Sequence, residues 1–155
     1  MTAAEYLSRP AALRRAAARE RNRVDTLRGL CTRLTSRLRE IRVQASPDPA
    51  RLQSLLAEIA DGEAEIRRME EALSRALEDT ALYISSLPDE RLIRVLELRY
   101  LEGLSWEDLS WQAGYSRACV FRYHRQALGL LPPPPAPPEE DPGPGEYPFL
   151  PPGGA

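Results

Sequence analysis

The sequence predicts an all-α protein with three segments: a long antiparallel helical hairpin (1–87), a three-helix domain (88–131) and a Pro-rich tail (132–155). Three observations support this prediction. Apolar residues recur every three or four positions along two long stretches. Gly103 and Gly114 then divide the next segment into three shorter helices. Finally, the last 24 residues contain eleven prolines, so we expect them to be disordered or in polyproline II conformation.

The first long helix is expected from residue 3 to about residue 43, with a heptad seam of coiled-coil type. Pro10 would interrupt a helix interior, so either the helix starts near Pro10 or residues 1–8 form a separate turn. The polar Glu20 interrupts the seam. The seam positions are Leu13, Ala17, Glu20, Val24, Leu27, Cys31, Leu34, Leu38 and Ile41.

The second long helix is expected from about Pro49 to Ser86, after the helix-breaking residues Ser46 to Pro49. A short connection between long helices favours an antiparallel hairpin, which would be a rod of about 60 Å. The small residues Gly62 and Ala76 would leave gaps in its packing, where a partner helix could enter. The seam positions are Leu52, Leu55, Ile59, Gly62, Ile66, Met69, Leu73, Ala76, Thr80, Tyr83 and Leu87.

Charge is distributed unevenly along the chain, although the net charge is only -2. Residues 1–44 contain eleven arginines and four acidic residues, which gives +7, and residues 45–87 contain four and nine, which gives -5. Residues 88–131 are balanced, and the tail has four acidic residues and no base. The two long helices would therefore attract each other. The hairpin is either a spacer or a surface for homodimerisation or partner docking, and its basic helix could alternatively follow DNA phosphates.

Capping signals define the three short helices of residues 88–131. Pro88 is expected as the first residue of the first helix, with Asp89 and Glu90 at its positive end and Gly103 after its C-terminus. Ser105 then caps a helix over residues 106–113, which Gly114 ends, and Ser116 caps a helix over residues 117–128. Two helices joined by a short turn containing glycine are typical of a helix-turn-helix unit that reads the DNA major groove.

Helical spacing separates the inner from the outer residues of this unit. The inner residues are Leu109, Ala113, Val120, Tyr123, Ala127 and Leu128, and the candidate DNA-binding residues are Ser116, Arg117, Ala118, Phe121, Arg122 and Arg125. Arginine can bind guanine in a bidentate manner, and a capped helix N-terminus can hold a phosphate. Arg99 is a further phosphate candidate. The alternative is an ordinary three-helix bundle whose surface arginines have no special role.

The segment RVLELRYLEGLSWEDLSWQAGYSRACVFRYHRQAL resembles region 4 of sigma-70-type factors, which reads promoter DNA. It resembles more narrowly the sigma-like helix-turn-helix of small phage and prophage regulators, the RinA-like and ArpU-like group. EYLSR, LRGLCTRLTS and RVQASPD resemble an uncharacterised phage protein family, so the resemblance covers about residues 3 to 131. Ser110 replaces the usual alanine, and Ala118 stands where sigma factors carry a polar base-reading residue.

The sequence contains no pattern typical of an enzyme, a metal site or a cofactor site. Cys31, Cys119 and the single His124 form no zinc-ligand cluster, and the adjacent carboxylates of Asp89 and Glu90 point different ways on a helix. We find no glycine-rich phosphate loop and no apolar run long enough for a membrane span. We therefore expect a cytoplasmic protein without cofactors, and the resemblance to phage regulators implies that it is associated with the nucleoid of a bacterial host.

These observations and the resemblance together predict a phage-type transcription regulator that binds double-stranded DNA in a sequence-specific manner. One alternative is a coiled-coil adaptor that docks on RNA polymerase or another phage protein, which is favoured by Ala118 and by the neutral charge of residues 88–131. A second alternative is a small terminase-like DNA-packaging subunit, which should assemble into rings.

Overall fold

The computed structural model describes residues 1–40 and 49–136, and all regular secondary structure in these ranges is helical. The predicted all-α class is therefore confirmed. The predicted helix breaker at Ser46 to Asp48, the seam position Ile41 and the predicted disorder of the tail beyond residue 136 lie outside the described residues.

The chain begins with a short helix, α1 (Ala3–Leu7), which is separate from the long helix α2 (Arg9–Glu40). The Thr2 hydroxyl accepts a hydrogen bond from the Glu5 backbone N–H, and the Glu5 carboxylate accepts one from the Thr2 backbone N–H. Pro10 occupies the first turn of α2, where its missing N–H is tolerated. The first residues thus form the separate turn that Pro10 suggested.

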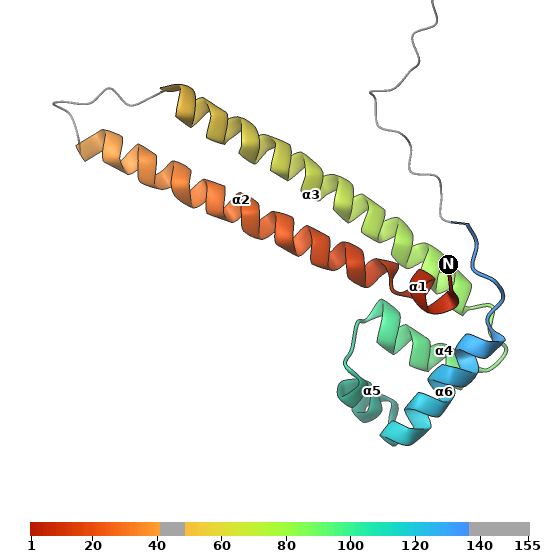
Figure 1. Cartoon of the computed structure of the whole chain (residues 1–155). Helices are drawn as coiled ribbons and strands as arrows, with labels where there is room; N and C mark the ends of the chain where they lie inside the picture. Colours follow the sequence, from red (N-terminus) through yellow and green to blue (C-terminus); the bar gives the residue numbers. More distant parts are fainter. Residues whose placement is uncertain (41–48, 137–155) are drawn as a thin grey trace, which may run out of the picture.

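Helix α3 (Pro49–Ile84) lies beside α2 and runs in the opposite direction (Figure 1). Ala17 and Val24 of α2 are buried, and every predicted seam position from Leu52 to Leu87 is buried or half-buried. Two ion pairs, Arg21 with Glu70 and Arg28 with Glu63, connect the helices. Because these side chains remain about half exposed, each pair contributes at most about 1 kcal/mol. The apolar seam is therefore the main attachment.

Gly62 of α3 packs directly against Val24 of α2, and the expectation that Gly62 leaves a gap in the packing is wrong. A Cβ atom at this position would lie 2.5 Å from Cγ2 of Val24, so the side chain of α2 already fills the space. Ala76 is also buried, with 1% of its surface exposed. Within the described residues, these small side chains let α2 and α3 approach each other and leave no room there for a partner helix.

The remaining helices are α4 (Glu90–Leu96), its π-helical continuation η1 (Glu97–Leu101), α5 (Trp106–Ala113) and α6 (Arg117–Leu130). We had expected Pro88 to be the first residue of α4, and this prediction is wrong. The Asp89 carboxylate accepts a 2.9 Å hydrogen bond from the Arg91 backbone N–H, so Asp89 caps the helix and Pro88 precedes it. Hydrogen bonds from the side chain and backbone of Arg91 also lower the pKa of Asp89.

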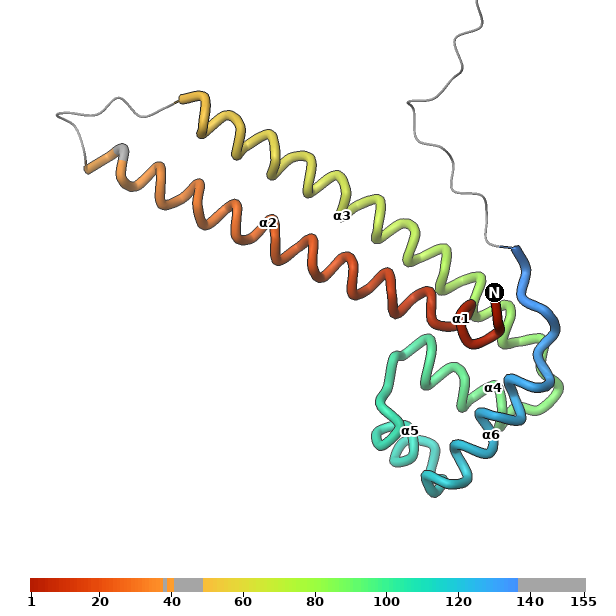
Figure 2. Tube along the Cα trace, viewed as in Figure 1, coloured from red at the N-terminus to blue at the C-terminus, as the bar shows by residue number. Residues whose placement is uncertain are grey.

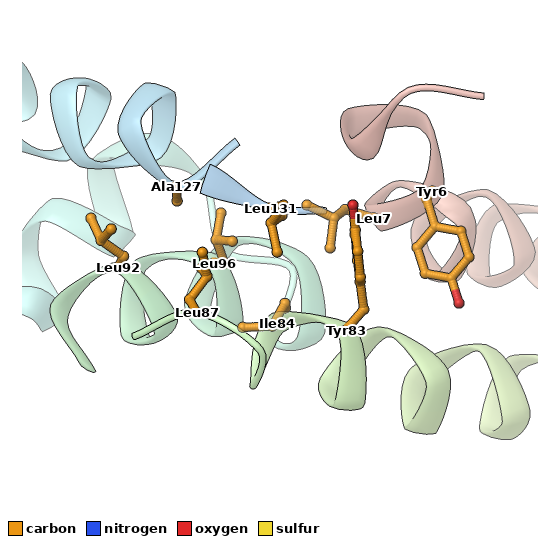
Figure 3. Close-up of a cluster of buried hydrophobic side chains, with 9 residues drawn as sticks. All are labelled: Tyr6, Leu7, Tyr83, Ile84, Leu87, Leu92, Leu96, Ala127 and Leu131. Carbon is orange, nitrogen blue, oxygen red and sulfur yellow. The ribbon is translucent and has the colours of Figure 1, made fainter. Parts of the chain in front are cut away.

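A buried apolar cluster connects the short helices to the α2/α3 pair. The chain start, the end of α3 and the three short helices lie at the same end of the molecule (Figure 2). Figure 3 shows the cluster, which consists of Tyr6, Leu7, Tyr83, Ile84, Leu87, Leu92, Leu96, Ala127 and Leu131. Hydrogen bonds from Tyr83 Oη to the Pro132 carbonyl oxygen (2.6 Å) and from Arg14 Nη2 to that of Leu101 (2.7 Å) add to this connection. The C-terminal end of α6 is thereby fixed against α3.

Candidate nucleic-acid interface

The turn between α5 and α6 consists of three residues, Gly114 to Ser116. Gly114 has a φ of 73°, a left-handed conformation that a side chain would disfavour, and its N–H donates to the Ser110 carbonyl oxygen. The Ser110 hydroxyl donates to the carbonyl oxygen of Tyr115, across the turn. Ser116 Oγ accepts a 3.2 Å hydrogen bond from the Cys119 backbone N–H. These local bonds determine where α6 begins and how it leaves α5.

One side of α6 is packed inward, as the spacing predicted. Val120 and Ala127 are 1% and 0% exposed, and Val120 belongs to a second apolar cluster with Val95, Leu98 and Leu109. The structure leaves all the candidate DNA-binding residues exposed: Ser116, Arg117, Ala118, Phe121, Arg122 and Arg125. Their contact with DNA stays a prediction, but the face that it requires is open in the monomer.

The arginines of this face have no acidic partner among the residues that the structure describes. Within residues 1–40 and 49–136, no carboxylate forms an ion pair with Arg117, Arg122 or Arg125. Arg122 makes only weak contacts, one from Nη2 to Cys119 Sγ at 3.7 Å and one with the Tyr123 ring, whose centroid lies 5.6 Å from Cζ. All three guanidinium groups can therefore bind an anionic or hydrogen-bond-accepting ligand without first breaking a salt bridge within the described part of the chain.

An aromatic cluster supports the α6 face from the side of α5. The Trp106 ring lies 4.9 Å from the Phe121 ring and 4.8 Å from the His124 ring, measured between centroids. His124 Nε2 is 2.7 Å from the hydroxyl oxygen of Tyr100. Burial of the imidazole, and secondarily the charge of Arg99, lowers the pKa of His124 below its ordinary value of 6.5. The imidazole thus forms part of the packing around Trp106, which in turn contacts Phe121.

Arg99, which we had considered as a phosphate ligand, is held within this cluster. Its guanidinium lies 4.3 Å from the centroid of the Trp106 ring, and its Nη1 donates a 2.8 Å hydrogen bond to the Leu104 carbonyl oxygen. This geometry gives Arg99 the role of holding Trp106 in place. Trp106 was not among the candidate residues predicted from the sequence, because helical spacing along α5 alone does not reveal which α6 residue it contacts.

Comparisons of the chain with protein-family models, curated proteins and solved structures found no match. None of the helices in the described part is long and apolar enough to cross a membrane. The same part contains no group of three or more His, Cys, Asp or Glu side chains that could hold a metal ion.

A second exposed feature lies on α5. Trp111 is 85% exposed, which is unusual for the largest apolar side chain. It lies two residues after the buried Leu109, so it projects from nearly the opposite side of the helix. Glu107 and Asp108, in the first turn of α5, are also exposed. The outer side of α5 is thus acidic and aromatic, whereas the outer side of α6 is basic.

Proposed function

We propose that this chain is a sequence-specific DNA-binding transcription regulator, in which α5 and α6 form a helix-turn-helix unit and α6 enters the major groove. The single observation that carries the proposal is the exposed face of α6, whose three arginines have no acidic partner among the described residues. This face begins at a serine-capped helix N-terminus, the end from which recognition helices contact bases.

Each side chain of the face has a distinct role in this proposal. Arg117, Arg122 and Arg125 supply guanidinium groups for the O6 and N7 acceptors of guanine or for backbone phosphates. Ser116 and the first N–H groups of α6 lie at the positive end of the helix dipole, which favours contact with a phosphate. The resemblance to sigma-70 region 4 and to phage regulators of the RinA-like and ArpU-like kind supports a role in transcription.

The α2/α3 pair, in this proposal, is an antiparallel coiled-coil-like hairpin that carries the DNA-binding unit at one end. The shared apolar cluster fixes the orientation of α6 relative to this hairpin. RNA polymerase, or a second copy of the chain bound through the outer surface of the hairpin, is the proposed partner. Dimerisation would place two copies of α6 at a defined spacing on a two-fold symmetric operator.

DNA binding is tested with a double variant, Arg117→Ala with Arg122→Ala. Each lost base contact should weaken binding to selected operator DNA by roughly 1 to 3 kcal/mol. The matched control is Arg67→Ala with Arg75→Ala, which removes the same charge from α3; both arginines are exposed and form no ion pair with another described residue. The control should retain most of the affinity. Equal affinity of the two folded double variants would contradict the proposal.

A protein-binding adaptor is the second candidate, and the exposure of Trp111 favours it. Tryptophan residues that are accessible in the free protein are frequent anchors of protein interfaces. The two functions differ in the salt dependence of binding to random DNA fragments, since counterion release accompanies only the DNA complex. The adaptor would be favoured if the affinity for random DNA fragments did not depend on salt and if a partner protein bound the chain but not its Trp111→Ala variant.

A further inference from the structure

We infer that α6 recognises the C5-methyl group of a pyrimidine, most simply a thymine, through an apolar patch formed by Ala118 and Phe121. The inference rests on the proposed DNA-binding function and names the chemical feature that this face would read. Ala118 and Phe121 are three residues apart on one helix, so they lie on the same face, and both are exposed. Phe121 retains 41% of its surface in contact with solvent.

The chemistry of the patch decides what it can read. Neither Ala118 nor Phe121 carries a hydrogen-bond donor or acceptor on its side chain, so neither can recognise the polar edge of a base. The apolar group that the common base pairs present in the major groove is the C5-methyl of thymine. Arg122 and Arg125 flank the patch on the same exposed side of α6. An apolar patch between arginines therefore matches a site in which a thymine lies next to guanine or phosphate contacts.

Packing around Phe121 indicates that its ring is held in place before DNA binds. Trp106 contacts the ring with an interplanar angle of 45°, and Trp106 is itself held between Arg99, at 4.3 Å, and His124, at 4.8 Å. A ring that is already positioned loses little conformational freedom on binding. This support distinguishes Phe121 from Leu130, an apolar residue of α6 that is 52% exposed near its C-terminal end.

The test begins with selection of bound sequences from a random duplex pool by the full-length chain. Each thymine of the selected site is then replaced by uracil, which removes only the methyl group. At one or two positions the affinity should fall about fourfold, the factor expected from the transfer free energy of one buried methyl group. Replacing that thymine–adenine pair by 5-methylcytosine–guanine should preserve more of the affinity than replacing it by cytosine–guanine, because only the first replacement retains the methyl group.

Protein variants then assign the methyl contact to the patch. Phe121→Ala should bind the thymine and uracil sites equally, whereas Leu130→Ala, which also removes an exposed apolar side chain from α6, should keep the fourfold preference. A preference that persists in Phe121→Ala would overturn the assignment.

Binding of the wild-type chain to modified DNA sites also tests the inference without any protein variant. Tight binding to a selected site in which no uracil replacement weakens the complex, or a selected site without thymine, would overturn the inference and leave DNA binding intact. Failure to select any sequence, with no salt-dependent binding to DNA, would overturn both the inference and the proposed function. The two failures are therefore distinguishable.

Discussion

Substitution of Gly62 by alanine should destabilise the protein, although alanine is the better helix former. In a helix interior, replacement of glycine by alanine normally gains about 1 kcal/mol. At Gly62, however, the new Cβ atom would lie 2.5 Å from Cγ2 of Val24, much closer than two carbon atoms can approach. The β-branched Val24 has a stiff χ1 and cannot turn away cheaply. Overpacking of this kind costs about 1 to 3 kcal/mol, so we expect a net loss of up to about 2 kcal/mol.

Gly29 provides the matched control, because it is also inside a long helix but is exposed. A Cβ atom at Gly29 would meet nothing within 4 Å, so Gly29→Ala should increase the free energy of unfolding by about 1 kcal/mol. Urea unfolding followed by far-UV circular dichroism measures both variants. Val24→Ala should relieve the clash, so its effect combined with Gly62→Ala should be smaller than the sum of the two separate effects. An increase in stability for Gly62→Ala equal to that for Gly29→Ala would refute the packing of α2 on α3.

Three further predictions concern other parts of the fold. Burial lowers the pKa of His124 in the folded protein below 6.5, its value in the unfolded chain, so the unfolded chain binds more protons at pH values between the two. The free energy of unfolding should therefore fall as the pH falls from about 6.5 towards the folded-state pKa. Urea titrations at several pH values should show a weaker pH dependence for His124→Gln. Thr80 is 1% exposed and its hydroxyl has no hydrogen-bond partner in the described part, so Thr80→Val should stabilise the protein by about 1 kcal/mol, measured by thermal and urea unfolding. Tyr83→Phe removes the hydrogen bond to the Pro132 carbonyl oxygen and should cost about 1 kcal/mol by the same measurement.

Local chemistry made some helix boundaries predictable from the sequence. The expected range of α5 agrees with the observed one, Trp106 to Ala113, because Ser105 and Gly114 satisfy the helix ends with their own side chain and backbone. The end of α6 was placed at Leu128, two residues too early. Helix α6 continues through Gly129 to Leu130, and Leu131 becomes extended (ψ 137°) because a proline follows it.

Contacts between distant residues could not be predicted in this way. The hydrogen bond from Arg14 to the Leu101 carbonyl oxygen joins residues 87 positions apart, and nothing in the periodicity of α2 distinguishes Arg14 from Arg15. In the candidate site, too, local features could be predicted from the sequence and contacts between helices could not. Spacing along α6 identified its exposed face, whereas the support of Phe121 by Trp106 depends on how α5 crosses α6. Periodicity gives the faces of a helix but does not give its partners.

The two ends of α6 differ in a way that bears on the proposed recognition of DNA. At its C-terminal end, Ala127 and the following Leu131 are buried in the apolar cluster. This cluster also contains Tyr83 and Ile84 of α3. Its N-terminal half has Val120 on the inner side and exposes Arg117 and Arg122 on the outer side. Since recognition helices contact bases mainly with their N-terminal residues, the end that should enter the groove is the end without a tertiary anchor on its outer face. The anchored end fixes the orientation of α6 relative to α2 and α3. If α6 binds DNA as proposed, a protein partner that binds the long helices would therefore also determine where α6 lies on the duplex.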